Sequence, residues 1–283
     1  MWCRMSRRAA RADARPRRPV ADILIDGAPA SADDLTYLAL VNYGAYTSFA
    51  VDDGAVRGLD MHLDRLGRSA EALFGEAPNE SELRRLMRRA VEGRTAAWLR
   101  VSLFSPEIWP RSPSWIGRPR VMTMTASPVA PLAASLRLTV QPYEREAAEL
   151  KHLATFGLIR ARRIARAAGF DDALFVDAQG RLSEGSLWNI GFVSGEHIVW
   201  PRASMLGGVA QRLIERGAGA NGLACETREI AVRDLAAFEV AFICNSATPM
   251  CPVAAIDGAV FAVDHPVLNR VRACWAAQAP QPI

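Results

Sequence analysis

The order in which strand-like and helix-like segments follow each other is the feature that most constrains the fold of this 283-residue chain. The first predicted strands end at turn sequences such as Asp26-Gly27 and Asp52-Asp53-Gly54. From Met61 the apolar residues recur at helical spacing, and Gly75 ends that helix. Later hairpins and helices lack the regular strand–helix alternation of a doubly wound sheet. The pattern therefore predicts an α+β fold.

The length of the chain gives room for two domains, each with its own core. A Pro-rich stretch, Ser127-Pro128-Val129-Ala130-Pro131, is typical of a linker. The first twenty residues are rich in Arg and lack the apolar core of a secretory signal, so we expect them to be disordered. The predicted organisation is an extension at residues 1–20, an N-terminal α+β domain at 21–127, a linker at 128–134 and a C-terminal domain at 135–283.

Charge and composition argue against several classes of partner. The formal net charge of +4 comes largely from the first twenty residues, and the remainder is near neutral, so we expect no nucleic-acid partner. No apolar run is long enough to span a bilayer, and we expect no membrane partner. The five cysteines and four histidines show neither a disulfide framework nor metal-ligand spacing. These features predict a reduced, cytoplasmic protein without a metal site.

Lys151 is the only lysine in the sequence, although Lys and Arg together number 34. Arginine can supply charge and solubility, but its guanidinium stays protonated and cannot attack a carbonyl group. A lysine ammonium group can lose its proton and form a Schiff base. The retention of one lysine therefore indicates a chemical role, and chance retention at the surface is the alternative.

Two later segments carry chemistry that fits such a lysine. Glu184 lies among small residues inside a predicted two-hairpin unit, where a buried carboxylate needs a cationic partner. The sequence Leu206-Gly207-Gly208-Val209 precedes a predicted helix, and the N-terminus of a helix suits a phosphate group. A Gly-Gly pair alone is a weak signal, so its value comes from its combination with Lys151 and Glu184.

Together these segments resemble the fold-type IV pyridoxal-phosphate enzymes, also called class IV aminotransferases. The group includes branched-chain and D-amino-acid aminotransferases and aminodeoxychorismate lyases. The resemblance extends from about Ile23 to the C-terminal helix and is most specific around Lys151, in Ala167–Leu174, and in Ser183-Glu184-Gly185-Ser186 with Asn189. It implies a smaller N-terminal α/β sandwich, a larger C-terminal pseudo-barrel domain that binds pyridoxal 5'-phosphate, and a homodimer.

The same resemblance implies roles for individual residues. Lys151 would be the Schiff-base lysine and would move the proton between the α-carbon of the substrate and the C4′ carbon of the cofactor. Glu184 would pair with the pyridine nitrogen. The phosphate of the cofactor would be bound by Arg65, by the backbone N–H groups of Val209 and Ala210, and by Ser246. Many relatives carry a threonine where Ala210 stands, so we expect one hydroxyl contact to be missing.

On the substrate side the resemblance implies Tyr46, Arg100 and Thr248. Other interpretations stay open, since Tyr46 could be a core aromatic and Arg100 could point outward from its strand. Asn189 could cap the turn between two hairpins or face the cofactor.

We expect an aminotransferase that exchanges an amino group between an amino acid and a 2-keto acid. The alternative is a lyase of the aminodeoxychorismate type, which releases pyruvate and 4-aminobenzoate; the runs Leu150-Lys151-His152-Leu153 and Ile243-Cys244-Asn245-Ser246 resemble that branch. A non-catalytic binding protein is the third interpretation, against which the intact lysine and glutamate argue. Phe156 stands where branched-chain enzymes have tyrosine, and the segment Tyr43–Thr47 is short, so we expect a substrate that is not a standard one.

Overall fold

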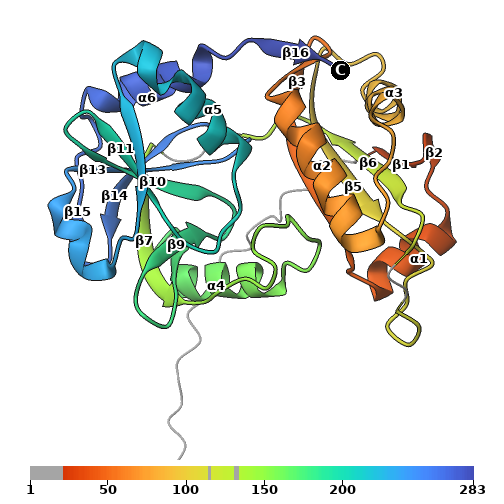
Figure 1. The fold of residues 1–283 in the computed structure, drawn as a ribbon, viewed down its shortest axis with the longest axis horizontal. Coiled ribbons are helices and arrows are strands. Elements are labelled where there is room, and N and C mark those ends of the chain that lie inside the picture. The colour runs from red at the N-terminus through yellow and green to blue at the C-terminus, as the bar shows by residue number, and fades with distance from the viewer. Residues whose placement is uncertain (1–21, 114–115, 131–133) are drawn as a thin grey trace, which may run out of the picture.

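The computed structural model describes residues 22–113, 116–130 and 134–283, which form two lobes that lie side by side (Figure 1). Both lobes mix strands and helices, which confirms the predicted α+β class. The predicted extension at residues 1–20 and residues 131–133 of the predicted linker lie outside the described residues. Within the described ranges no helix is long and apolar enough to cross a bilayer.

The N-terminal lobe is built on one seven-stranded sheet with the strand order β16-β4-β3-β5-β6-β1-β2. Its elements come from residues 22–126 and, for one strand, from the C-terminal end of the chain: β1 (Asp22–Ile25), β2 (Ala28–Pro29), α1 (Ala32–Leu40), β3 (Gly44–Asp52), β4 (Ala55–Arg57), α2 (Leu59–Phe74), α3 (Glu80–Ala90), β5 (Ala96–Phe104), β6 (Arg120–Ala126) and β16 (Pro280–Pro282). Alternate residues of β5, Leu99, Val101 and Leu103, pack into a core with α2 and α3. The opposite face of β5 therefore carries Trp98 and Arg100, and it is the face from which site residues come.

Helix α2 carries two polar residues into the interior together with its apolar stripe. Gly75 ends the helix in the left-handed region at φ 73°, as the sequence predicts. His62 and Arg65 lie about one turn apart on the buried side. His62 Nδ1 lies 2.6 Å from Thr47 Oγ1 on β3, and burial lowers the pKa of His62 well below its ordinary value. The apolar residues buried on the same helix are Leu59, Met61, Leu63, Leu66, Ala70 and Phe74.

The C-terminal lobe contains a closed ring of six strands in the order β10-β13-β14-β7-β8-β9, with β9 pairing back onto β10. A single residue pair, Glu184 with Asn189, makes the closing contact. The ring agrees with the pseudo-barrel that the resemblance implies. The strands and helices of this lobe are β7 (Leu136–Pro142), α4 (Phe156–Ala167), β8 (Asp172–Val176), β9 (Leu182–Gly185), β10 (Asn189–Ser194), β11 (His197–Pro201), α5 (Val209–Ala218), β12 (Ala224–Arg228), β13 (Val240–Cys244), β14 (Cys251–Ile256), β15 (Ala259–Val260) and α6 (Val267–Ala276), with 3₁₀ turns at Gly219–Asn221 and Val232–Ala237.

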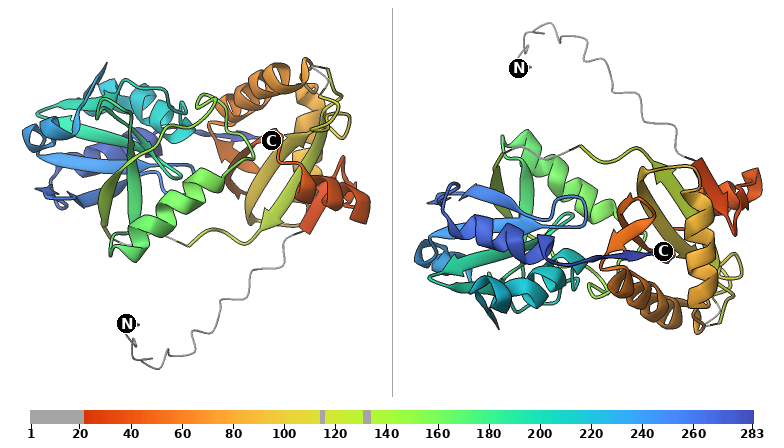
Figure 2. Two further views of the ribbon diagram at one scale, coloured as in Figure 1. Left: turned by 90° about the horizontal axis from the view of Figure 1, so that it is seen from below. Right: turned by 90° about the horizontal axis from the view of Figure 1, so that it is seen from above.

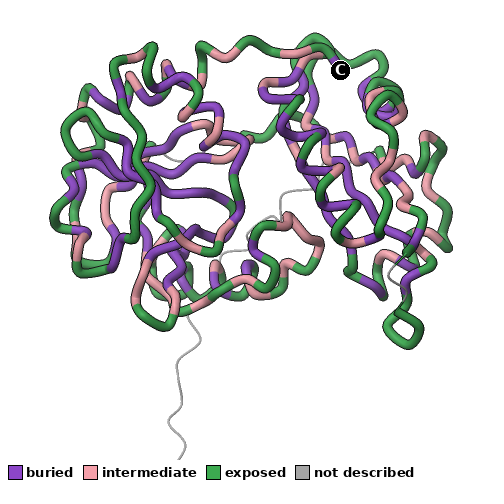
Figure 3. The backbone as a smooth tube through the Cα atoms, viewed as in Figure 1, coloured by how far each residue is buried: buried purple, intermediate pink, exposed green. Residues whose placement is uncertain are grey.

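The further views in Figure 2 show that the two lobes stay side by side from below and from above. Burial follows this division, because the strands at the centre of each lobe are buried and the connecting loops are exposed (Figure 3). Of the cysteines in the described residues, Cys244, Cys251 and Cys274 are buried, whereas Cys225 on β12 is exposed.

Helix α1 was not predicted, because the stretch before Asp34 was interpreted only as polar. Ser31 and Asp34 form a capping box, in which each side chain bonds the backbone of the other residue. Tyr37 fixes the helix to the lobe, since its hydroxyl donates to the carbonyls of Ser105 and Ile108 at 2.5 Å and 2.8 Å. The Ser-x-x-Asp spacing was the available signal, and the short helix offered only a weak apolar period.

The C-terminal end of the chain returns to the N-terminal lobe, a pairing that the sequence did not predict. Strand β16 pairs with β4 in antiparallel register. Ile283 is 8% exposed and belongs to the core beneath α2 and α3. Arg84 and Arg88 of α3 donate to the carbonyls of Pro282 and Ile283 at 2.9 Å and 2.8 Å. The end of the C-terminal domain therefore ties the two lobes together.

Ile283→Ala is expected to lower the free energy of unfolding by about 2 kcal/mol, because it removes a buried side chain from a packed core. Urea denaturation followed by circular dichroism measures the change. Val260→Ala is the control, since Val260 is an aliphatic strand residue that is 80% exposed, and its effect should stay within about 0.5 kcal/mol. Equal effects of the two substitutions would contradict the tethering role of the last residue.

Candidate active site

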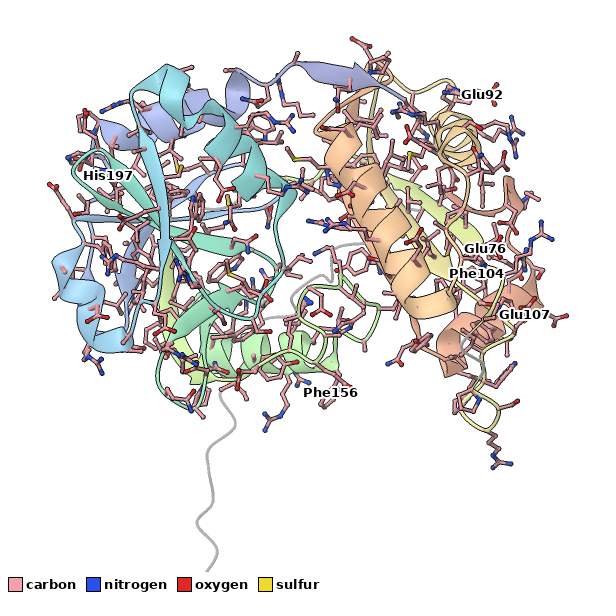
Figure 4. The ribbon with its side chains drawn as sticks, viewed as in Figure 1. Glu76, Glu92, Phe104, Glu107, Phe156 and His197 are labelled. Carbon is pink, nitrogen blue, oxygen red and sulfur yellow. The ribbon has the colours of Figure 1, made fainter. Side chains whose placement is uncertain are left out.

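A cavity of about 160 Å³ lies between the two lobes, and both lobes contribute to its wall. Several of the residues predicted from the sequence line it, namely Lys151, Glu184, Arg65, Tyr46 and Ser246. The wall also contains Ser48, Trp98, Arg145, His152, Leu158, the turn Gly185–Asn189, Leu206, Gly208, Val209, Asn245 and Ala247. The side chains that fill the space between the lobes are drawn in Figure 4.

The segment that carries Lys151 belongs to the C-terminal half of the chain but pairs with the N-terminal sheet. The Tyr46 amide donates to the Lys151 carbonyl, and the Leu153 amide donates to the Gly44 carbonyl, both at 2.8 Å. A Cβ on Gly44 would lie 2.3 Å from the Leu103 carbonyl oxygen, so a glycine is needed at this close approach. These backbone bonds fix the lysine at the seam between the lobes.

The electrostatic surroundings of Lys151 favour its neutral form. Burial, followed by the cations Arg65 and Arg145, lowers the pKa of Lys151 to about 7, and Glu184 opposes this shift. The Nζ atom lies 4.9 Å from the centroid of the Tyr46 ring. Because a neutral amine is the nucleophilic form, the site keeps a large fraction of this lysine reactive near neutral pH.

Glu184 sits at the closing pair of the barrel and is 5% exposed. Among the described residues its Oε1 atom has no hydrogen-bond partner. Burial raises the pKa of this carboxyl group, although the cation Arg145 acts in the opposite direction. A buried carboxylate oxygen without a donor is costly unless a ligand supplies one. The Oε1 atom therefore marks a place where a cationic or N–H group of a ligand would bind.

Arg145 is a site residue that the sequence did not predict. Its Nε atom lies 3.6 Å from Glu184 Oε1, and both side chains are nearly inaccessible, at 6% and 7% exposure. Its guanidinium also donates to the carbonyls of Ala148 and Leu150, just before the lysine. The arginine thus joins the lysine segment to the barrel carboxylate. No sequence signal identified it, because it lies in an irregular acidic stretch.

Arg65 and the N-terminus of α5 form the opposite end of the site. Arg65 is 8% exposed and donates from Nη2 to the Gly207 carbonyl at 2.6 Å. Burial lowers its pKa to about 10, so it stays charged at neutral pH. The first N–H groups of α5 have no partners within the helix, and Val209 begins that helix at the cavity wall. Guanidinium and helix N-terminus together suit a phosphate.

Two predicted phosphate-side residues occupy different positions relative to the cavity. Ser246 lines both the main cavity and a neighbouring one of about 230 Å³. Ala210 lines only the neighbouring cavity, where His62 and Phe49 also lie. A methyl group at position 210 leaves space there that a hydroxyl-bearing residue would partly fill.

The predicted substrate residues do not all reach the cavity. Tyr46 lines it, whereas Arg100 stands behind Tyr46 with its guanidinium carbon 3.6 Å from the ring centroid. Thr248 lies outside the lining, and its backbone N–H donates to Asn245 Oδ1 at 2.7 Å. Phe156 was expected in the pocket, but it is 78% exposed on α4 at the edge of the molecule (Figure 4).

A buried polar cluster supports the turn after Glu184. The carboxylate of Asp172 accepts from the Ser186 hydroxyl at 2.8 Å and from Trp188 Nε1 at 3.0 Å. A Cβ on Gly185 would lie 2.2 Å from the Trp188 ring, so the glycine admits the indole. The Ser-Glu-Gly-Ser sequence thus fixes the carboxylate of Glu184 through the packing of the turn that follows it as well as through strand pairing. No group of three or more His, Cys, Asp or Glu residues within the described ranges could hold a metal ion.

Comparison with known proteins agrees with this architecture. A family model described as amino-transferase class IV matches residues 44–256, more than half of the chain. The branched-chain amino acid aminotransferase of Escherichia coli is similar, with 20% identity and a TM-score of 0.80 over 91% of this chain and 94% of that chain. At this identity the similarity shows the fold. No curated protein matches the sequence.

Two further solved structures are similar at the level of the fold. A hypothetical aminotransferase from Mycobacterium tuberculosis in its PLP-bound form has 21% identity and a TM-score of 0.74, over 91% of this chain and 98% of that chain. A putative 4-amino-4-deoxychorismate lyase from Legionella pneumophila has 19% identity and a TM-score of 0.76, over 89% of this chain and 96% of that chain.

The ionisation of Lys151 can be measured directly, because no other ε-amine is present. The rate of trinitrophenylation by 2,4,6-trinitrobenzenesulfonate is expected to rise with pH and to level off around a midpoint near pH 7, since only the neutral amine reacts and its pKa is lowered to about 7. Mass spectrometry of the peptide that contains Lys151 gives the rate. A midpoint near the ordinary lysine pKa of 10.5 would contradict the electrostatic description.

Two substitutions should move this midpoint in opposite directions. Arg145→Gln removes a cation that disfavours the ammonium form, so the pKa of Lys151 rises. Glu184→Gln removes a carboxylate that favours the ammonium form, so the pKa falls. Arg163→Gln, at an exposed position of α4, is the control and should leave the midpoint in place. If the pKa of Lys151 shifted in the same direction in both variants, the opposite electrostatic effects given to Arg145 and Glu184 would be wrong.

Proposed function

The chain belongs to the class IV aminotransferase family, and on this premise we propose that it is a pyridoxal-phosphate-dependent transaminase that moves an amino group between an amino acid and a 2-keto acid. The cofactor of this family is pyridoxal phosphate. The observation that carries the proposal is the arrangement of three groups in one cavity: the single lysine, with a pKa lowered to about 7; a buried carboxylate oxygen without a hydrogen-bond donor among the described residues; and an arginine beside a helix N-terminus, which suits an anion.

The residues of the cavity fit this cofactor at both ends. Glu184 Oε1 is buried without a donor in the described structure, which suits a protonated ring nitrogen. Arg65 and the free N–H groups at Val209 suit a phosphate. When bound, pyridoxal phosphate supplies an aldehyde that condenses with an amine and a ring that withdraws electrons. Lys151, between these ends, supplies the amine.

We propose that Lys151 acts first as a nucleophile and then as a base and acid. Its neutral form, which the lowered pKa makes abundant near neutral pH, would be the nucleophile toward the aldehyde of a bound cofactor. As a free amine it would accept the α-proton of the substrate, and as the resulting ammonium group it would give that proton back. The backbone bonds from Tyr46 and Leu153 keep the lysine in place during both steps.

Glu184, in this proposal, keeps the ring nitrogen protonated. Its burial strengthens the attraction to a cation, because little water screens the pair. Arg145, 3.6 Å away, limits the rise in the pKa of Glu184 and so supports the charged form. The carboxylate is therefore available as an anion when a cationic ring occupies the cavity.

The phosphate contacts in the proposal come from Arg65, the backbone of Val209 and Ala210, and the hydroxyl of Ser246. Tyr46 is the substrate-side residue that lines the cavity. Arg100 supports the Tyr46 ring, and Thr248 shapes the loop of Asn245 through its backbone. We also propose a homodimer, as the family resemblance implies, and a cytoplasmic location, as the cysteine pattern predicts.

A lyase that releases pyruvate from aminodeoxychorismate is the second candidate. Two observations favour it: the run Leu150-Lys151-His152-Leu153 resembles that branch, and the Legionella pneumophila protein with that description matches over 96% of its length. Both reactions use the same lysine and cofactor, so only the substrate side separates them.

Lys151→Ala is expected to abolish the yellow colour that the wild-type protein acquires with pyridoxal phosphate, because no ε-amine remains to condense with the aldehyde. Turnover should fall by about 10³-fold or more. Visible absorption and an amino-transfer assay measure the two effects. Arg160→Ala, at an exposed position of α4, should keep both properties. A wild-type protein that takes up no cofactor would overturn the assignment.

Glu184→Gln should retain the cofactor but lower kcat by about 10²-fold, because a neutral amide does not hold the ring nitrogen in its protonated form. Equilibrium binding and steady-state kinetics separate the two effects. Glu149→Gln is a matched control, since Glu149 is an exposed carboxylate near Lys151. An unchanged kcat in the Glu184 variant would remove this residue from the mechanism.

The two candidate reactions separate in a half-reaction experiment. A transaminase loaded with pyridoxal phosphate should convert it to pyridoxamine phosphate when a suitable amino acid is added, and chromatography with mass detection shows the product. Release of pyruvate from aminodeoxychorismate, with no conversion by any amino acid, would favour the lyase instead.

A further inference from the structure

Asn189 occupies the point at which the barrel closes. It is the first residue of β10, and its Cα atom pairs with Glu184 on one side and with Cys244 on the other. It is 4% exposed and lines the main cavity. A polar side chain at such a position needs hydrogen-bond partners inside the protein. Those partners identify what the residue does.

The side chain of Asn189 binds the residue that leads into α5. Its Nδ2 atom donates to the Leu206 carbonyl at 2.8 Å. The backbone N–H of Leu206 acts on the carboxylate of Glu184 and opposes the rise that burial causes in the pKa of that group. Leu206 is thus held through its carbonyl by Asn189, and its N–H interacts with Glu184. The next residue, Gly207, accepts from Arg65.

The requirement for glycine at position 208 comes from Asn189 and not from the backbone. Gly208 has φ −64° and ψ 137°, an extended conformation that any residue adopts. A Cβ at this position would lie 1.9 Å from Asn189 Oδ1, far inside the van der Waals distance. The amide oxygen of Asn189 therefore fills the space that a side chain on residue 208 would need.

We propose that Asn189 is a positioning residue, which fixes the Leu206–Gly208 turn and thereby sets the N-terminus of α5 relative to Glu184. This inference rests on the proposed pyridoxal-phosphate function. The same turn interacts with Glu184 at the ring-nitrogen end and is bonded to Arg65 at the phosphate end. Asn189 bonds the turn between them and excludes any side chain from Gly208. The distance between the two ends of the cofactor site thus depends on one amide side chain.

The first test compares two ligands on the Asn189→Ala variant. Loss of one buried hydrogen bond should weaken the binding of pyridoxal phosphate by about tenfold. For pyridoxal, which lacks the phosphate, the change in the logarithm of the dissociation constant should be less than half as large, because the displaced turn affects the phosphate end. Quenching of intrinsic fluorescence gives both dissociation constants, so the readout does not depend on turnover. Equal weakening of the two ligands would indicate a general structural defect and would overturn the proposal.

The second test uses the predicted steric conflict at position 208. Gly208→Ala should weaken the binding of pyridoxal phosphate by about tenfold or more, because the new methyl group clashes with the Asn189 amide. The double variant Asn189→Ala with Gly208→Ala should bind more tightly than Gly208→Ala alone, since truncation of Asn189 removes the conflict. Gly219→Ala is the matched control: it adds a methyl group at the other end of α5, where nothing lies within 4 Å of the new Cβ.

The outcomes separate failure of this inference from failure of the proposed function. If the wild-type protein takes up no pyridoxal phosphate, the function itself is wrong. If it does, and Gly208→Ala binds as tightly as Gly219→Ala, the positioning role is wrong. If the double variant is no better than Gly208→Ala alone, Asn189 is not the group that excludes the side chain, and the proposal falls. The Gly208 comparison remains decisive if Asn189→Ala does not fold.

Discussion

The backbone pairing between the lysine segment and the edge of β3 is the interaction on which the rest of the site depends. The lysine lies beyond the first lobe in sequence, yet two backbone hydrogen bonds attach Lys151 to Tyr46 and Leu153 to Gly44. A lysine has a long flexible side chain, so its reactive nitrogen is fixed only if its backbone is fixed. The pairing places Nζ near the aromatic ring of one lobe and the carboxylate of the other. The cavity therefore exists because the two lobes share this segment.

Burial and charge together lower the pKa of Lys151. Desolvation is the largest cause, Arg65, Arg145 and Arg100 add to it, and the carboxylate of Glu184 acts in the opposite direction. Arg65 and Arg145, which line the cavity, also make it suitable for an anionic ligand, because a phosphate or carboxylate group would relieve their repulsion. Lowering the lysine pKa and attracting an anion are thus two consequences of one charge distribution.

The sequence predicted those features that depend on residue chemistry and local period. The single lysine, the glutamate among small residues and the glycine-led helix all line the same cavity. Features that depend on distant contacts were missed. Strand β16 forms because Ile283 fits a core built from residues more than 160 positions earlier, a contact that no local pattern reveals. Arg145 looks like a charge in a polar loop until the fold places it beside Glu184. Phe156 was expected in the pocket from its spacing to the lysine, but the helix that begins there turns it to solvent.

The closing contact of the barrel explains why the site lies where it does. Five of the six junctions in the ring are made by several residue pairs or by a ladder with a bulge, whereas β9 meets β10 at one pair only. Strands β9 and β10 share no further pair, and the Asn189 amide connects the closing pair to the Leu206 carbonyl in the turn before α5. The carboxylate of Glu184, the amide of Asn189 and the N-terminus of α5 therefore lie together at the cavity wall. The segment that carries Lys151, which pairs with β3 of the N-terminal lobe, contributes to the same cavity.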